Sequence, residues 1–245
     1  MPEDADLYLP ILVGAKKNWR PSIWYQRDDQ GLNISDYNPN YSELTAIYWA
    51  WKNLKDVDAI GLVHYRRFFF KGHKKRKISN VLSHKEAEAL LKKSGILLPK
   101  KRRYYIETNY SHYIHAHHRL PIDTTRDVIL ENYPDYLKYF DQVMSRRSAH
   151  MFNMFIMKKV FFDNYCDWLF DLLEKVGKRI DIEDYSTQEK RVFGYLSELL
   201  MDVWISKNDL DYSEINWQML GKQDLLRKIY FFLKRKFGCK TQTHF

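Results

Sequence analysis

Hydrophobic residues recur along this chain of 245 residues with spacings that distinguish helices from strands. From residue 42 to residue 54 they return every three or four positions, which predicts an amphipathic helix. Residues 59–63 are apolar almost without interruption and predict a short buried strand soon after that helix. Further helices are expected at 83–93, 124–131, 136–144, 160–177 and 185–210, and further strands at 95–99 and 148–159. This alternation of helices and strands predicts an α/β fold.

The predicted strand at 59–63 leads directly into four residues with polar groups, His64, Tyr65, Arg66 and Arg67. In open α/β sheets, ligands bind outside the carboxyl ends of the strands. Because a guanidinium group presents a fixed fork of donors, two adjacent arginines at that position are suited to hold a pyrophosphate. The alternative is a strand that simply ends at a basic surface.

Residues 104–118 combine aromatic side chains with histidines and show no clear period, which predicts a loop beside a functional site. Neutral imidazole is a common metal ligand. However, the spacing of His112 and His115, and of the two histidines that follow them, matches no standard metal motif. Hydrogen bonding to a substrate or to a neighbouring loop is therefore the favoured interpretation of these histidines.

Acidic side chains cluster between residues 181 and 189. A carboxylate of this cluster could act as a general base or orient a sugar hydroxyl, provided that the cluster lies beside the binding crevice. The alternative is a helix N-terminus made acidic to suit the helix dipole.

Net charge and cysteine content narrow the class of protein. A formal net charge of +9 and a pI near 9.3 indicate anionic partners, which could be nucleic acid, phosphorylated small molecules or anionic lipid. The two cysteines lie far apart, so neither a disulfide framework nor a cysteine-based zinc site is expected. The acidic start M-P-E-D-A-D has no apolar run behind it and no stretch is long enough to cross a bilayer, so we expect a cytoplasmic protein.

The chain is expected to divide into a main domain at residues 1–215 and a basic tail at 216–245. Within the tail, apolar side chains of residues 223–240 share one helical face and basic side chains flank it. Such a helix binds an anionic membrane surface, which would hold the protein on the inner face of the cell membrane. The alternative is a helix that packs back onto the domain.

Four blocks of sequence resemble one known family. They are N-P-N-Y-S-E-L-T-A-I-Y-W-A-W-K-N, G-L-V-H-Y-R-R-F-F, R-R-S-A-H-M-F-N-M-F-I-M-K-K and V-F-G-Y-L-S-E-L-L-M-D-V-W-I. In this order they resemble bacterial capsular and exopolysaccharide glycosyltransferases, a family long known only as a domain of unknown function. The resemblance extends from about residue 7 to about residue 209.

This resemblance implies a GT-A-like, Rossmann-related mixed sheet flanked by helices that binds a nucleotide sugar. It implies transfer of a hexosyl group, most simply galactosyl from a UDP donor, to a lipid-linked oligosaccharide acceptor. Where GT-A enzymes carry D-x-D, this chain has His64, Tyr65 and Arg66. Because a hard cation prefers oxygen ligands, a manganese or magnesium site is disfavoured there, although a divalent metal is not excluded.

The expected site residues fall into three groups. The donor site is expected to include Asn40, Glu43 and Thr45 together with residues 64–67. The sugar or acceptor is expected to meet His112, His115, His150 and Asn153. If the strand at 148–159 is regular, His150 and Asn153 lie on opposite faces. The resemblance supplies no catalytic base, and Asp184, Gln188 and Glu198 are the candidates from their spacing.

One departure from the family concerns the beginning of the chain. Relatives usually open with a further short apolar strand, so the first strand of the fold is expected to be missing here. Two other functions stay open, one because of this missing strand and one because of the basic charge of the chain. One is a truncated, inactive glycosyltransferase relative, and the other is a nucleic-acid-binding module that uses the basic segments 71–77 and 100–103 with Tyr104, Tyr105 and Tyr110.

Overall fold

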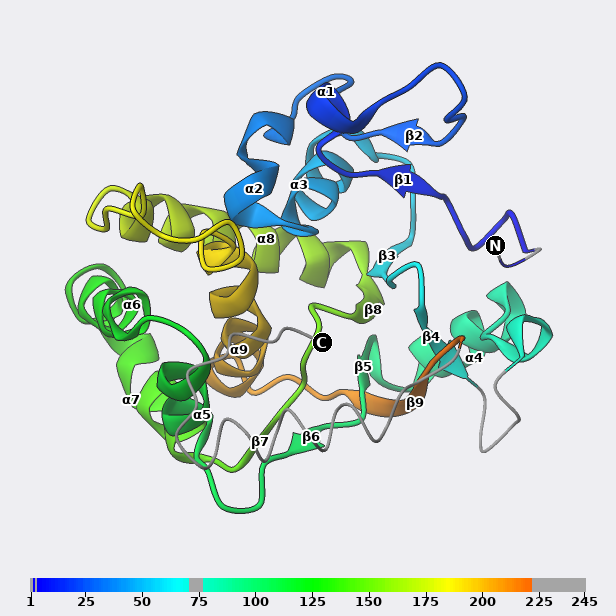
Figure 1. Cartoon of the computed structure of the whole chain (residues 1–245). Helices are drawn as coiled ribbons and strands as arrows, with labels where there is room; N and C mark the ends of the chain where they lie inside the picture. The colour runs from blue at the N-terminus through cyan, green and yellow to red at the C-terminus, as the bar shows by residue number, and fades with distance from the viewer. Residues whose placement is uncertain (1, 3, 71–76, 222–245) are drawn as a thin grey trace.

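A five-stranded mixed sheet forms the centre of the computed structural model, which describes residues 2, 4–70 and 77–221 (Figure 1). The strand order is β3-β8-β5-β9-β4. The strands of this sheet are β3 (Ala59–Leu62), β4 (Arg67–Phe70), β5 (Ile96–Pro99), β8 (Phe155–Lys158) and β9 (Ser213–Met219). The fold is therefore mixed α/β, as the sequence predicts.

The two outer strands of the sheet are consecutive in the chain. β8 pairs antiparallel with β3 and β5, whereas β9 runs parallel to β5 and antiparallel to β4. Only residues 63–66 separate β3 from β4, although these strands lie at opposite ends of the strand order. The two ends of the sheet must therefore come close together at this short connection.

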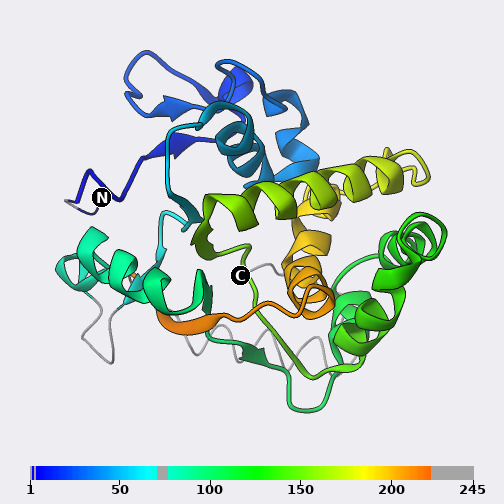
Figure 2. The same cartoon turned by 180° about the vertical axis from the view of Figure 1, so that it is seen from behind.

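Side chains on alternate strand positions divide between two hydrophobic cores. Ile96 and Leu98 of β5 belong to the larger core, whereas Leu97 between them belongs to the smaller one. This follows from the two-residue period of a strand, which points successive side chains to opposite faces. α4 (His84–Ser94) covers the smaller core, and Figure 2 shows it at the opposite side of the molecule from most helices.

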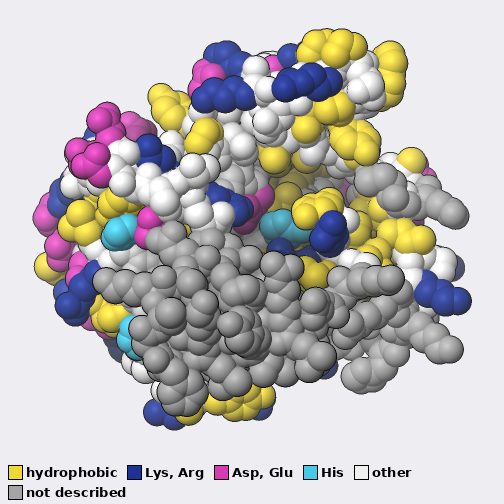
Figure 3. Space-filling model, in the orientation of Figure 1, with side chains coloured by type: hydrophobic (Ala, Val, Ile, Leu, Met, Phe, Trp, Pro, Cys, Tyr) yellow, Lys and Arg dark blue, Asp and Glu magenta, His cyan; other side chains and the backbone are white. Residues whose placement is uncertain are grey.

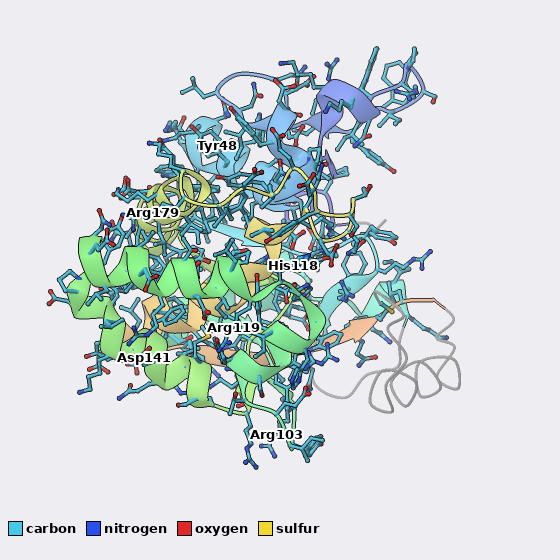
Figure 4. All side chains as sticks on the ribbon, turned by 60° about the vertical axis from the view of Figure 1, so that its left-hand side comes forward. Tyr48, Arg103, His118, Arg119, Asp141 and Arg179 are labelled. Atoms are coloured by element: carbon cyan, nitrogen blue, oxygen red, sulfur yellow. The ribbon has the colours of Figure 1, made fainter. Side chains whose placement is uncertain are left out.

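The larger core is covered by the remaining long helices. These are α3 (Leu44–Asn53), α5 (Asn109–Ala116), α6 (Arg119–Asn132), α7 (Pro134–Ser145), α8 (Lys159–Gly177) and α9 (Val192–Lys207). Figure 4 shows α6 and α7 side by side at the surface, where Arg126 on α6 donates two hydrogen bonds to Asp141 on α7. Among the described residues, none of the helices combines the length and apolar character needed to span a membrane.

An N-terminal excursion precedes the sheet and carries the shortest elements. It contains β1 (Ile11–Leu12), α1 (Ala15–Asn18), β2 (Gln26–Arg27), the 3-10 helix η1 (Ser35–Tyr37) and α2 (Asn38–Tyr41). Asp28, which is 0% exposed, holds this excursion together. Its carboxylate accepts hydrogen bonds from the backbone of Gly14 and Ala15 and from the hydroxyls of Ser35 and Thr45, at 2.6–2.9 Å. The remaining short elements are η2 (Ile78–Asn80), β6 (Arg102–Arg103) and β7 (Ser148–Ala149).

Residues 104–118, which the sequence predicts to be a loop, contain the helix α5. The backbone of Thr108 and that of Ser111 are each capped by the side chain of the other residue. This reciprocal capping satisfies donors at the start of the helix and stabilises a helix that hydrophobic periodicity alone does not reveal. The expected proximity to a pocket is nevertheless seen, as described below.

The predicted strand at 148–159 is interrupted. β7 and β8 are separated by residues 150–154, where Phe152 and Asn153 adopt positive φ angles of 78° and 52°. The Asn153 amide donates hydrogen bonds to Glu43 at 2.7 Å and to the Gly194 carbonyl at 3.1 Å, which holds this unusual backbone. The strand is therefore not regular, so the condition under which His150 and Asn153 were expected on opposite faces is not met.

The C-terminal part differs from expectation at two points. The helix expected at 185–210 starts later than predicted: residues 185–191 are not helical, and α9 begins at Val192. The strand β9 was not predicted and continues to Met219, beyond the boundary expected at residue 215. The predicted helix at 223–240 lies outside the described residues, so the division into two domains and the role of the tail stay predictions.

Candidate functional site

A cavity of about 520 Å³ lies beside Glu43, where four other segments meet. These are the turn at residues 64–67, the segment 102–117 with α5, the interruption at 150–154, and residues 188–199 at the start of α9. We call it the Arg67 pocket. Figure 3 shows a hollow near the centre of one face, with histidine, basic and acidic side chains at its wall.

The turn at 64–67 projects its two arginines in different directions. His64 and Arg67 exchange two backbone hydrogen bonds of 3.1 Å, which places Tyr65 and Arg66 at the tip. Arg67 is half-buried, lines the pocket and lies 4.3 Å from the centre of the Phe152 ring. Arg66 is exposed, does not line the pocket and lies 5.1 Å from the Tyr65 ring. The expected pair of guanidinium groups therefore contributes one arginine to the cavity.

Two carboxylates face Arg67. Burial raises the pKa of Glu198 to about 8, with the negative charge of Glu43 acting in the same direction and Arg67 in the opposite one. Glu198 still presents part of its surface to the pocket. Burial also lowers the pKa of Arg67, although both carboxylates counteract that effect. The site thus holds a carboxyl group that titrates near neutral pH beside a cation.

Hydrogen bonds from His64 and Asn153 shape the floor of the pocket. His64 Nε2 donates to the Phe152 carbonyl at 2.5 Å and so fixes the turn against the interruption. Asn153 is buried behind the cavity and orients Glu43 through its amide. Arg191, with a nitrogen 3.9 Å from a Glu43 oxygen, also lines the pocket.

The predicted histidines on α5 share one carboxylate. Glu107 contacts the Nδ1 atoms of His112 at 2.7 Å and His115 at 2.9 Å. His112 also stacks on Tyr104, with ring centres 3.9 Å apart, and lines the pocket, whereas His115 does not. Within the described residues, no group of three or more His, Cys, Asp and Glu side chains is arranged to hold a metal ion. The metal dependence of the protein stays a prediction.

Besides Arg66, His115 and Asn153, four of the sequence-predicted residues lie outside the pocket lining. His150 is buried and contacts Asp202 through Nδ1 and Glu214 through Nε2, the latter at 3.2 Å. Asn40 donates to the Lys190 carbonyl at 3.1 Å, Thr45 belongs to the Asp28 network, and Asp184 is exposed. These contacts give His150, Asn40 and Thr45 evident structural roles.

The structure also brings in residues that the sequence reasoning did not assign to the site. They include Arg102, Tyr104, Arg191 and Tyr195, and all four line the Arg67 pocket. Arg102 lies within the basic run 100–103, and Arg191 directly precedes α9, so each had a visible charge signal without a way to place it. Gln188, which was predicted, lines the pocket and contacts the Tyr195 hydroxyl.

The aromatic residues of the nucleic-acid alternative do not form one exposed surface. Tyr104 stacks on His112 beside the pocket, and the Tyr110 hydroxyl donates to Asp123 at 2.8 Å. Of the three, Tyr105 alone is largely exposed, at 78%. Figure 4 shows Arg103, from the adjoining basic run, at the lower edge of the molecule. A base-stacking platform made of these tyrosines is therefore absent from the described residues.

A cationic pocket beyond the end of a strand is the place at which open α/β sheets bind their ligands. Residues 1–209 match the family described as domain of unknown function DUF4422, so the chain belongs to this family. A comparison with curated proteins found no match.

A solved structure, the apo form of the bifunctional glycosyltransferase WbbM, is similar to this chain over 87% of its length, with 29% sequence identity and a TM-score of 0.81. The chain spans 42% of WbbM. The expected glycosyltransferase-like fold is thereby confirmed.

Proposed function

We propose that this chain is a glycosyltransferase whose nucleotide-sugar donor binds in the Arg67 pocket. The observation that carries the proposal is a half-buried Arg67 beside a carboxyl group with a pKa near 8, within a fold similar to that of WbbM. A fixed guanidinium fork suits a diphosphate, and burial strengthens that attraction. Arg102 and Arg191 add positive charge along the same cavity.

Glu198 is the residue best suited to act as the general base. When the acceptor hydroxyl bonds to the anomeric carbon, the bond from that carbon to the phosphate oxygen breaks, and the nucleoside diphosphate leaves with the electron pair. The hydroxyl proton passes to the ionised form of Glu198, whose pKa near 8 suits proton transfer at neutral pH. Asp184 is exposed outside the pocket, and Gln188 carries an uncharged amide, so neither serves this step as well.

If arginines bind the diphosphate of the donor, the protein should not need a divalent metal for donor binding. Arg67 and its neighbours supply the positive charge that a divalent cation supplies in D-x-D enzymes, so we expect binding without manganese or magnesium. The most specific version of the proposal is galactosyl transfer from a UDP donor to a lipid-linked oligosaccharide during capsular or exopolysaccharide synthesis, at the cytoplasmic membrane surface. Its basis is the family resemblance.

The two neighbouring arginines provide a matched test of donor binding. UDP added without metal should raise the melting temperature of the wild-type protein, and Arg67→Ala should abolish that rise because the phosphates lose their buried partner. Arg66→Ala should leave it intact, since Arg66 lies outside the cavity. The measurement is thermal unfolding with UDP, GDP, CDP and dTDP, each with and without manganese. Equal UDP stabilisation of both variants would remove Arg67 from the diphosphate site.

A further inference from the structure

An exposed aromatic surface lies on the N-terminal excursion, outside the Arg67 pocket. Trp24 is 90% exposed and Trp19 is 38% exposed, whereas three of the seven tryptophans of the chain, Trp49, Trp168 and Trp204, are buried. A tryptophan side chain left almost wholly in water forgoes the large gain from burying its ring. When further apolar side chains are exposed beside such a residue, they indicate a surface that meets a partner.

The pairing of β1 with β2 adds further apolar side chains to this surface. The backbone nitrogen of Gln26 donates to the Pro10 carbonyl at 3.0 Å, which brings the segments before the two strands together. Leu9 and Tyr25, which are 56% and 47% exposed, belong to these segments. We define the Trp24 surface as Leu9, Trp19, Trp24 and Tyr25 with the exposed basic residues Lys17 and Arg20.

The charge around these aromatic residues has one predominant sign. Residues 7–27 contain four basic side chains and no aspartate or glutamate. Two of the four have acidic partners, because Lys16 contacts Asp36 and Arg27 contacts Asp29. Lys17 and Arg20 therefore provide the positive charge of the Trp24 surface. Figure 3 shows hydrophobic and basic side chains over the top of the face that carries the central hollow, with a few acidic side chains beside them.

We propose that the Trp24 surface docks the folded domain onto an anionic lipid bilayer. Tryptophan and tyrosine favour the boundary between headgroups and acyl chains, and nearby lysine and arginine add attraction to anionic lipid. A neutral glycan could stack on the same rings, but it would gain little from Lys17 and Arg20, so the charge favours the bilayer. This docking uses described residues apart from the tail at 223–240 and does not depend on the transfer reaction.

The Asp28 network gives the surface a firm base. Asp28 follows β2 directly and accepts four hydrogen bonds, two of them from the start of α1. The loop at 19–25, which carries Trp24, runs between these two anchored elements. An anchored loop loses less conformational entropy when its aromatic side chains enter the bilayer.

The experiment uses the full chain and vesicles of phosphatidylcholine with or without 30% phosphatidylglycerol. Brominated phosphatidylcholine in the same vesicles quenches tryptophans that enter the bilayer, which separates docking by Trp24 from attachment by the tail. Wild-type emission should be quenched on anionic vesicles, and Trp24→Phe should lose at least about half of that quenching. In sedimentation, Trp24→Ser should weaken binding on the order of tenfold, and Lys17→Glu with Arg20→Glu by a similar factor.

Leu130→Ser, at an exposed apolar residue on α6, is the matched control and should bind vesicles like the wild type. Unchanged quenching in Trp24→Phe would overturn the proposal, because Trp24, the most exposed aromatic residue of the surface, would then stay outside the bilayer. Binding that is equally strong in Trp24→Ser would overturn it by assigning attachment to the rest of the chain. A response to soluble oligosaccharide that exceeds the response to anionic vesicles would assign the surface to glycans. Each result leaves the UDP test of the Arg67 pocket unaffected.

Discussion

Two carboxylates of this protein are withdrawn from water in different ways. Asp28 in the N-terminal excursion accepts four hydrogen bonds from backbone and hydroxyl donors. Glu198 in the Arg67 pocket is held among charged neighbours, and burial with the repulsion from Glu43 raises its pKa to about 8. A carboxylate whose acceptor sites are filled by the protein builds structure, whereas one that is left poorly compensated beside a cavity is available for chemistry.

We expect the largest effect on stability at Asp28. In Asp28→Ala, the four groups that donate to the carboxylate lose their acceptor in a buried place, so we expect the free energy of unfolding to fall by about 4 kcal/mol. Urea denaturation measures this loss. The matched control is Asp36→Ala, which removes an exposed ion pair with Lys16 and should leave the free energy of unfolding almost unchanged. Similar losses in the two variants would mean that the Asp28 network adds little stability.

The next effect concerns the rate of sugar transfer. Glu198→Gln keeps the shape of the side chain but cannot accept the hydroxyl proton, so the rate should fall about 100-fold or more. The wild-type rate should rise with pH up to about 8 as Glu198 loses its proton, and the variant should lack this rise. The measurement is UDP release from UDP-galactose across pH 6–9. Asp184→Asn, at an exposed site, is the control that should retain activity.

The helices and strands that the sequence predicts well are those set by local periodicity. α3, α4 and α8 carry apolar residues at helical spacing, and β3 and β5 are short apolar runs. The interruption at 150–154 could not be predicted from local periodicity. Its backbone depends on a hydrogen bond from Asn153 to Glu43, which is 110 residues away in the sequence. β9 had an unrecognised local signal, since Ile215, Trp217 and Met219 alternate with polar residues.

The sequence predicted several of the residue types at the candidate site, but not which of those residues line the cavity. Arg67, Glu198 and His112 are among the predicted residues that the fold brings to one cavity. Which of two adjacent arginines enters that cavity is decided by the backbone pairing of His64 with Arg67, which sequence composition does not encode. Likewise, nothing local distinguishes Thr45, which serves the Asp28 network, from Glu43 two residues earlier, which lines the pocket.

The raised pKa of Glu198 also makes the stability of the fold depend on pH. Glutamate in the unfolded chain titrates near 4.5, whereas Glu198 in the fold titrates near 8. Between these values the native carboxyl holds a proton that the unfolded chain has lost, so this contribution to stability declines as pH rises and is fully lost above about 8. Glu198→Gln should therefore melt above the wild type at pH 8.5, with the difference vanishing toward pH 4.5. Thermal unfolding at several pH values tests this, and a difference independent of pH would contradict it.

The smallest expected effect lies at Tyr104, whose buried hydroxyl has no hydrogen-bond partner among the described residues. Burial raises the pKa of Tyr104 to about 12, so the hydroxyl stays protonated at neutral pH and can donate to a bound ligand. Tyr104→Phe removes a polar group that the fold leaves uncompensated, so stability should be unchanged or rise by up to about 1 kcal/mol, while UDP-galactose affinity falls several-fold. Urea denaturation and ligand titration measure the two quantities. Tyr105→Phe, next to it and 78% exposed, should change neither, and a loss of stability in Tyr104→Phe would show that this hydroxyl supports the fold, as Asp28 does.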